Sequence, residues 1–314
     1  MNRIILPVLF LISLNSFSQT YESKNRIVPY FIDYWVHDYY GNGIEVNMGT
    51  GKEYGSPPWY SQRNNLVGNV KRTELKEFNG EIKFGEFERG KISKSTISHF
   101  VDENKMTEKS VFDNENNLMN RTTYTHNDQG NQIESYVYNS ENKLTYKYTF
   151  DYNEIGNQIE KNCYDSSGRI LRKLKLKFDD DGTLIESKDY NSDGKLFSKS
   201  SYELDENDNY IELNLDNKEI SELSKRYKNW YNSMGDVIVK IDYSDIPDRR
   251  VEYIYDRNRN LISQKSFHVN PLKTFLIEDK RFEYEYDEVG NWIKKYSYSN
   301  DVQNGYSERT IIYY

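Results

Sequence analysis

The chain has 314 residues, a formal net charge of −8 and a mean hydropathy of −0.93. Its hydrophobic content of 36% is low for a compact globule, but an aromatic share of 15%, with 29 tyrosines, compensates because tyrosine rings pack while their hydroxyls stay in water. The acidic balance argues against nucleic acid as a partner, and the composition favours a thin, aromatic-rich sheet over a thick-cored α/β enzyme.

The first expected segment is a secretory signal peptide over residues 1–18. Arg3 supplies a positive charge, an apolar run follows to Leu14, and Ser16 and Ser18 are the small residues that precede a cleavage site. The alternative, a membrane anchor, needs about 20 apolar residues, and this run is shorter. We therefore expect cleavage near Ser18 and a secreted or periplasmic mature chain without a membrane span.

Residues 19–80 form the second expected unit, an irregular N-terminal region. It holds a glycine-rich stretch and the run Pro57-Pro58-Trp59-Tyr60. One interpretation is a cap that covers the first strand edge, which repeat sheets need. The other is a ligand-binding region with exposed aromatic side chains, in which Trp59 and Tyr60 are the candidates.

The third unit, residues 81–314, repeats a short motif: an aromatic residue, Asp or Asn, two polar residues, Gly, and an aliphatic residue soon after. Clear copies run from Tyr164 to Ile170 and from Tyr286 to Ile293. Asp or Asn starts a type I turn, and Gly, Asn and Asp accept the left-handed backbone that follows; such a turn with a bulge joins hairpin strands. The left-handed positions are expected at Asn104, Asn116, Gly130, Asn142, Gly156, Gly168, Gly182, Gly194, Asp208, Gly235 and Gly290.

The spacing of these positions predicts the topology. From residue 104 to 208 the steps alternate between 12 and 14 residues, which leaves strands joined at alternate ends. Looser copies extend the series to Gly90 and Asn304, a poor copy puts Arg259 at the left-handed site, and an insertion between Val269 and Asp279 interrupts the last hairpins. The predicted fold is all-β, a long antiparallel up-and-down meander of repeated hairpins that can curl on its aromatic face.

Strand composition agrees with this fold. From Leu144 to Tyr152 apolar and aromatic residues alternate with Lys, Thr and Asp, as in half-buried strands. No proline lies between residues 59 and 246, where it would remove a ladder hydrogen bond. The one cysteine, Cys163, falls at a strand position, so we expect a packed residue and no internal disulfide.

The Tyr-Asp-x-x-Gly-Asn/Arg-x-Ile/Leu unit resembles the YD repeat of Rhs-type proteins over about residues 90–314. The resemblance implies a coiled sheet of β-hairpins, in large members a shell around a toxin domain, and associations with carbohydrate or cell surfaces. The chain departs from the pattern of that family in its double period of 26 residues, which is longer than usual. It ends in an expected strand from Arg309 to Tyr314, and we expect no toxin domain.

We find no pattern typical of catalysis or of a bound metal or cofactor. The four histidines lack partners at metal-ligand spacing. Asp-rich turns such as residues 179–182 lack the residue order and closing Glu of a calcium loop, so turn formation explains them better. No nucleophile elbow, phosphate loop or dinucleotide fingerprint occurs. Because the chain has 50 acidic residues, two neighbouring carboxylates carry no information about glycosidase chemistry. We therefore expect no catalytic residues, no metal and no cofactor.

These observations lead to one functional hypothesis and two alternatives. The first is an exported, non-catalytic binding or scaffold module at the cell envelope or outside the cell, with a protein or a cell-surface glycan as partner. The second is a carbohydrate-binding protein that uses Trp59, Tyr60 and Trp292, which lie beside turns or in the irregular region; other strand aromatics are expected to stack in cross-strand ladders. The third is a hydrolase with an unrecognised carboxylate pair.

Overall fold

A computed structural model describes residues 36–37, 43–44, 66–84, 86–102, 105–180, 182–204, 210–215, 224–232, 236–242, 248–270 and 272–314. The expected signal peptide, Trp59, Tyr60 and the expected turn positions Asn104, Asp208 and Gly235 lie outside these residues. Ahead of the main sheet, β1 (Val36–His37) and β2 (Gly43–Ile44) form a small antiparallel pair.

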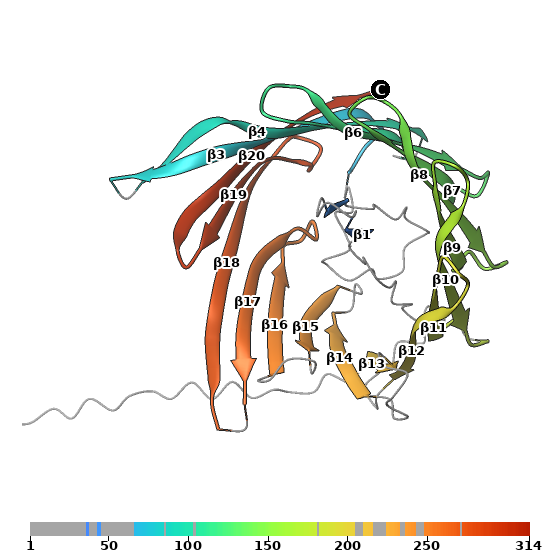
Figure 1. Cartoon of the computed structure of the whole chain (residues 1–314). Helices are drawn as coiled ribbons and strands as arrows, with labels where there is room; N and C mark the ends of the chain where they lie inside the picture. Colours follow the sequence, from blue (N-terminus) through green and yellow to red (C-terminus); the bar gives the residue numbers. More distant parts are fainter. Residues whose placement is uncertain are drawn as a thin grey trace, which may run out of the picture.

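All later strands belong to one sheet, in which each strand pairs antiparallel with the next along the chain (Figure 1). The predicted all-β, up-and-down meander of hairpins is confirmed. The strands are β3 (Val70–Lys83), β4 (Glu86–Val101), β5 (Lys105–Phe112), β6 (Leu118–His126), β7 (Gln132–Asn139), β8 (Leu144–Tyr152), β9 (Gln158–Asp165), β10 (Ile170–Phe178), β11 (Leu184–Asn191), β12 (Leu196–Leu204), β13 (Tyr210–Leu215), β14 (Ser224–Tyr231), β15 (Val237–Asp242), β16 (Asp248–Tyr255), β17 (Leu261–Val269), β18 (Thr274–Tyr286), β19 (Trp292–Ser299) and β20 (Val302–Tyr313).

The last strand pairs with the first strand of this sheet, so the sheet closes into a ring. β20 runs antiparallel to β3, with Tyr306 opposite Phe78 and Tyr313 opposite Val70. Figure 1 shows cyan β3 and red β20 side by side at the top of the ring. The sheet thus begins at Val70, inside the segment expected to be irregular, and β20 covers the edge of β3 for which a cap was expected.

One face of the sheet carries most of the buried side chains. Val137, Tyr148, Phe150 and Cys163 form one cluster on β7 to β9, and their cross-strand partners lie on the same face. Cys163 is a buried free thiol, as expected, and burial raises its pKa.

The opposite, charged face carries cross-strand ion pairs. Glu134 binds Lys147 at 2.6 Å across β7 and β8, and Glu186 binds Lys199 at 2.7 Å across β11 and β12. Glu160 pairs with Lys173 at 3.0 Å in the same way. Each of these carboxylates is partly buried among the stems of its neighbours, so the charged face is ordered by its own side chains.

The repeated motif forms the predicted turn. In the copy at Asp165, the Gly168 N–H donates to the Asp165 carbonyl at 3.0 Å, and the Asp165 carboxylate accepts the N–H groups of Ser167 and Arg169. The register shifts at the base of this turn, as in a bulged hairpin. Left-handed φ angles occur at Asn116, Gly130, Asn142, Gly156, Gly168, Gly182, Gly194 and Gly290.

Two of the looser copies are not turns. Gly90 lies within β4 and Asn304 within β20, and the left-handed residues of these hairpins are instead Phe84 and the pair Asn300–Asp301. Both hairpins differ from the regular 12- and 14-residue steps. Their strands continue through the glycine and asparagine because the opposite strand offers ladder partners on both sides of those residues.

Because hairpins alternate, the turns lie on two rims of the ring. On the first, which we call the tyrosine rim, tyrosines at strand ends donate their hydroxyls to the neighbouring turn or to the residue that follows it, as do Tyr152, Tyr255, Tyr286 and Tyr313. His126 and Phe178 stand before two other turns of this rim. Tyr152 donates to the Gln132 carbonyl at 2.7 Å, and Tyr313 to the Asp287 carboxylate at 2.5 Å. The turns of this rim span residues 127–131, 153–157, 179–183, 232–236, 256–260 and 287–291.

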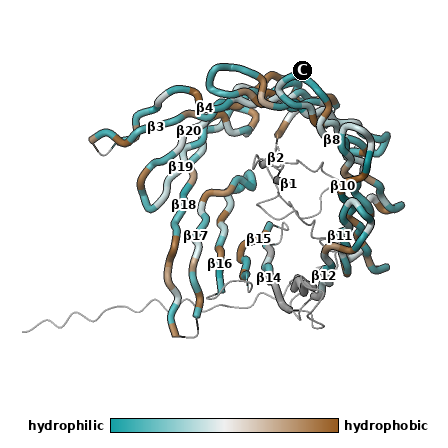
Figure 2. The backbone as a smooth tube through the Cα atoms, viewed as in Figure 1, coloured by the Kyte–Doolittle hydropathy of each residue, from teal (hydrophilic) through white to brown (hydrophobic). Residues whose placement is uncertain are grey.

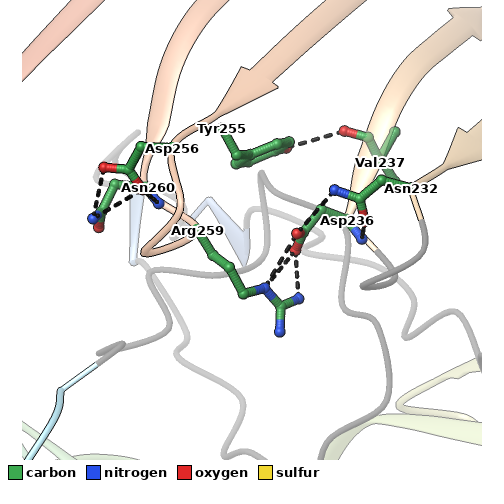
Figure 3. A network of polar contacts seen from close by, with 7 residues as sticks. All are labelled: Asn232, Asp236, Val237, Tyr255, Asp256, Arg259 and Asn260. Carbon is green, nitrogen blue, oxygen red and sulfur yellow. Dashed lines mark hydrogen bonds and ion pairs between the residues drawn. The ribbon is translucent and has the colours of Figure 1, made fainter.

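Figure 3 shows one part of the tyrosine rim, where Tyr255 donates to the Val237 carbonyl at 3.1 Å. The poor motif copy at Arg259 does adopt the left-handed conformation, with φ of 63°. Its guanidinium binds the carboxylate of Asp236, in the preceding turn, at 2.5 Å. This contact offsets the strain of a side chain at a site that favours glycine.

Within the residues that the structure describes, the second rim, which we call the hairpin rim, holds the turns at residues 113–117, 139–143, 165–169 and 191–195 and three hairpins of other lengths. These hairpins are β3–β4, β17–β18 and β19–β20. In Figure 1 the tips of β3–β4 and β17–β18 extend beyond the rest of the ring. The irregular steps in the sequence therefore mark the place where the ring departs from its repeat.

Candidate functional site

An aromatic strip crosses the charged face where the ring closes. It consists of Tyr296 and Tyr298 on β19, Tyr306 on β20 and Phe78 on β3, all partly exposed. Tyr296 lies opposite Tyr306, and Tyr306 lies opposite Phe78, with ring centroids 5.2 and 5.5 Å apart. These contacts form a cross-strand ladder of the expected kind, on the exposed side of the sheet.

Carboxylates border the aromatic strip and bind its hydroxyl groups. Tyr296 donates to Glu285 at 2.6 Å, Tyr298 to Glu283 at 3.0 Å, and Tyr306 to Glu308 at 2.6 Å. These bonds fix the ring orientations, so the strip is ordered before any ligand binds.

Two guanidinium groups stack on the ends of the strip. Arg89 lies 4.2 Å from the ring centroid of Phe78 and binds Glu308 at 2.5 Å, while Arg281 lies 3.9 Å from the centroid of Tyr298 and pairs with Glu283. Both arginine side chains are about half exposed, so a ligand that stacks on these rings can displace them at little cost.

A groove of about 760 Å³ adjoins the strip over β16, β17 and β18. Ile254, Ser263 and Arg281 follow one another across these three strands, and Lys265 lies opposite Asp279 with their charged groups 2.9 Å apart. The groove is lined by Ile254, Asp256, Ile262, Ser263, Lys265, Asp279, Arg281, Phe282, Glu283, Tyr284, Tyr286 and Asp301. Arg281 and Glu283 belong to both the groove and the border of the strip.

The charges of the groove favour neutral or cationic ligands. Its lining has the carboxylates of Asp256, Asp279, Glu283 and Asp301 against the cations of Lys265 and Arg281. The hydrogen bond and charge of Asp279 raise the pKa of Lys265, so Lys265 stays charged at neutral pH.

The strip offers fixed donors and acceptors at neutral pH. Burial, followed by the hydrogen bond and charge of Glu308, raises the pKa of Tyr306 to about 12. Hydrogen bonds from Lys294 and Tyr296 lower the pKa of Glu285. Tyrosines that stay protonated and a Glu285 carboxylate that stays charged suit ligand binding better than proton transfer.

Trp292, the described member of the three predicted ligand-binding residues, lies at the start of β19 on the tyrosine rim. Its ring is 6.0 Å from that of Tyr284, and the guanidinium of Arg309 stacks 4.0 Å from its centroid. Arg309 also donates to the Trp292 carbonyl at 2.9 Å. The structure therefore places Trp292 in packed surroundings, away from the aromatic strip, and its ligand-binding role remains a prediction.

Sequence reasoning did not identify the strip or the groove. Their tyrosines alternate along β19 and β20 like those of every other strand, and only register shows which rings are neighbours. The one available signal was the insertion between Val269 and Asp279, because it falls in the hairpin that borders the groove.

The described part of the chain contains no group of three or more His, Cys, Asp or Glu side chains arranged to hold a metal ion. His126 is partly buried, and burial together with the charge of Lys105 lowers its pKa. Within the same residues, no helix is long and apolar enough to span a membrane.

No family model and no curated protein sequence matches the chain. Among solved structures, a porin-like protein from Bacteroides uniformis has a TM-score of 0.41 and 10% sequence identity, covering 79% of this chain and 99% of that one. A Photorhabdus luminescens Tc holotoxin pore has a TM-score of 0.31 and 12% identity, covering 70% of this chain and 14% of that one. A porin-like protein from Bacteroides vulgatus has a TM-score of 0.20 and 14% identity, covering 78% of this chain and 99% of that one.

Proposed function

We propose that the protein is an exported, non-catalytic binding module that captures its partner on the charged face of β16 to β20 and β3. The observation that carries this proposal is the preordered aromatic strip beside a groove of about 760 Å³. Aromatic side chains with fixed polar neighbours are typical of protein surfaces that recognise ligands. Export to the envelope or beyond rests on the N-terminal sequence.

The contacts of the carboxylates beside the strip support a non-catalytic function. Glu283, Glu285 and Glu308 each bind a cation and a tyrosine hydroxyl. A general acid needs a carboxyl with a raised pKa, whereas that of Glu285 is lowered. Turnover in a broad hydrolase screen that is lost in Glu285→Gln would overturn this part of the proposal.

The experiment compares binding by the exported full chain and by two matched variants, on a glycan array and in cross-linking to native envelope. Tyr296→Ala removes the centre of the strip, and Tyr136→Ala removes a charged-face tyrosine of β7 that binds Glu134 in the same manner. We expect Tyr296→Ala to lose at least about tenfold in affinity, as for an interface anchor, and Tyr136→Ala to bind normally. Equal binding by all three chains contradicts the site.

Carbohydrate is the second candidate for the partner, because the strip presents partly exposed tyrosine rings next to carboxylates that accept sugar hydroxyls. Cross-strand spacing of about 4.8 Å places successive rings at the separation of adjacent sugar units. Array signals for neutral polysaccharides that disappear in Tyr296→Ala would establish this candidate. An array without signals would leave a protein as the partner.

A further inference from the structure

The β17–β18 hairpin leaves part of β18 with only one neighbour. β18 pairs with β17 from Thr274 onward, but its pairing with β19 begins only at Lys280. At the boundary, the Asn300 N–H donates to the Asp279 carbonyl at 2.8 Å. The segment from Thr274 to Glu278 is therefore an edge strand, and Figure 1 shows β18 extending past β19.

This edge strand is apolar and exposed on both faces. Phe275, Leu276 and Ile277 are 46%, 53% and 44% exposed, and Leu272 at the tip is 97% exposed. Phe275 and Leu276 point to opposite faces, and a β-bulge at Ile277 interrupts the alternation after them. Lys273 lies 4.7 Å from the ring centroid of Phe275, and all three apolar side chains keep about half of their surface exposed. Figure 2 shows the brown, apolar colouring of this part of β18.

The other long hairpin of the same rim shows how an edge is normally protected. Beyond its pairing with β20, the β3–β4 hairpin carries Glu81, Lys83, Glu86 and Glu88, with Lys83 and Glu88 2.7 Å apart. Charged residues on an edge discourage the addition of a further strand. No charged residue occurs from Thr274 to Ile277, so the edge of β18 lacks this protection.

We propose that the Thr274–Glu278 edge of β18 binds an extended peptide segment of a partner protein as an added strand. This inference rests on the proposed function and names its partner class. An added strand pairs with the open backbone groups and covers Phe275, Leu276 or Ile277 with its own alternate apolar residues. The edge ends at Asp279, which lines the acidic groove, so a Lys or Arg next to the apolar stretch of the peptide reaches the carboxylates of Asp279 and Asp301.

Two other occupants fit the segment less well. Insertion into a membrane would bury the open backbone edge in hydrocarbon, where each unsatisfied group costs several kcal/mol. A second copy paired edge to edge would contact over about five residues, roughly 17 Å of strand, whereas stable dimers bury about 800 Å² per partner. A peptide strand satisfies the backbone groups and needs no larger surface.

The test is selection of short random peptides displayed on phage, with the full chain as the target. We expect the selected peptides to alternate apolar residues and to carry a flanking Lys or Arg. A synthetic selected peptide should slow hydrogen–deuterium exchange at residues 274–278 by at least about tenfold at saturation, because its backbone protects their amides. The same peptide with alternate backbone nitrogens methylated should not bind, since it cannot extend the ladder.

Ile277→Lys places a charge on the edge and should abolish binding, while Ile82→Lys, at an exposed position of the β3–β4 hairpin, should leave it unchanged. Four outcomes would each overturn the inference. No peptide is selected, or the methylated peptide binds as well as the unmodified one. Alternatively, the chain dimerises with rising concentration and protects residues 274–278 without peptide, or it binds anionic vesicles in a way that Ile277→Lys abolishes. Glycan or envelope binding that depends on Tyr296 would still support the proposed function after such a failure. Edge-bound peptides together with normal partner capture by Tyr296→Ala would instead contradict only the proposed strip.

Discussion

The two rims use the same turn but surround it differently. On the tyrosine rim the residue after the left-handed position is buried in several turns, with Asn131, Asn157 and Asn291 at 4%, 6% and 1% exposure. On the hairpin rim the corresponding residues, such as Asn117 and Arg169, are exposed. The local motif therefore fixes the turn, while the surroundings of the turn on each rim determine whether the residue after the left-handed position is buried.

Some tyrosine contacts join turns that are one 26-residue double period apart. Turns on the tyrosine rim recur at this spacing at Gly130, Gly156 and Gly182, and Tyr152, before the turn at Gly156, reaches Gln132 beside the turn at Gly130. On the hairpin rim Tyr138, which precedes the turn at residues 139–143, packs against the guanidinium of Arg121, 4.4 Å from its ring centroid. One rim thus links neighbouring hairpins, and the other leaves its hairpins open to partners.

The largest difference between the rims should appear at Asn291. Its side chain accepts from the Val67 N–H and donates to the Val67 carbonyl and to Tyr313, each at 2.7 Å. Asn291→Ala removes these three hydrogen bonds and empties a buried side-chain site, and we expect the free energy of unfolding to fall by about 3 kcal/mol. Asn117→Ala, at the same turn position on the hairpin rim, should cost no more than about 0.5 kcal/mol. Urea unfolding measures both, and similar losses would show that the rims do not differ.

Replacing the turn glycine should lower the free energy of unfolding by the same amount on both rims. Gly156 and Gly168 have φ angles of 87° and 84°, and an added Cβ would meet no atom within 4 Å at either position. Only backbone strain then distinguishes Ala from Gly, so each Gly→Ala change should lower the free energy of unfolding by about 1 kcal/mol. Thermal unfolding of the two variants tests this. A much larger loss at Gly156 would mean that the tyrosine rim also constrains the turn backbone.

The hydrogen bond from Tyr152 to the neighbouring turn should contribute less to the free energy of unfolding, and only on the tyrosine rim. Tyr152→Phe removes the hydroxyl that binds the Gln132 carbonyl and should cost about 1 kcal/mol, the usual net value of one hydrogen bond. Tyr164→Phe, before the turn at Asp165 on the hairpin rim, provides the matched control and should be nearly neutral. Equal unfolding midpoints in urea for the two variants would exclude the link as a source of stability.

The sequence predicted the hairpin meander and its turns because both depend on local chemistry, namely alternation and left-handed residues such as Asn142 and Gly168. It did not predict the closing pair of β20 and β3, since Tyr306 and Phe78 are 228 residues apart and no local pattern joins them. The aromatic strip depends on that closure. The edge at Thr274 depends on the difference in length between two hairpins, and the sequence showed this difference only as an insertion.

The smallest expected effect is on the pH dependence of stability. On either rim, it should differ between turns that begin with Asp and turns that begin with Asn. Hydrogen bonds from Ser167 and Arg169 lower the pKa of Asp165 to about 2 from a reference of 3.8. A lowered folded-state pKa stabilises the fold above the reference value, and this contribution is lost as the pH falls from about 4 to about 2. Burial raises the pKa of Asp287, but hydrogen bonds from Tyr313 and from backbone N–H groups outweigh it and leave the pKa lowered, so its contribution is lost on acidification in the same direction. Asn139 accepts the same turn bonds without titrating.

Asp165→Asn should therefore flatten the dependence of the urea midpoint on pH below about 4, and Asn139→Asp should steepen it. A profile unchanged by both substitutions would show that the turn carboxylates do not set the acid stability of the ring.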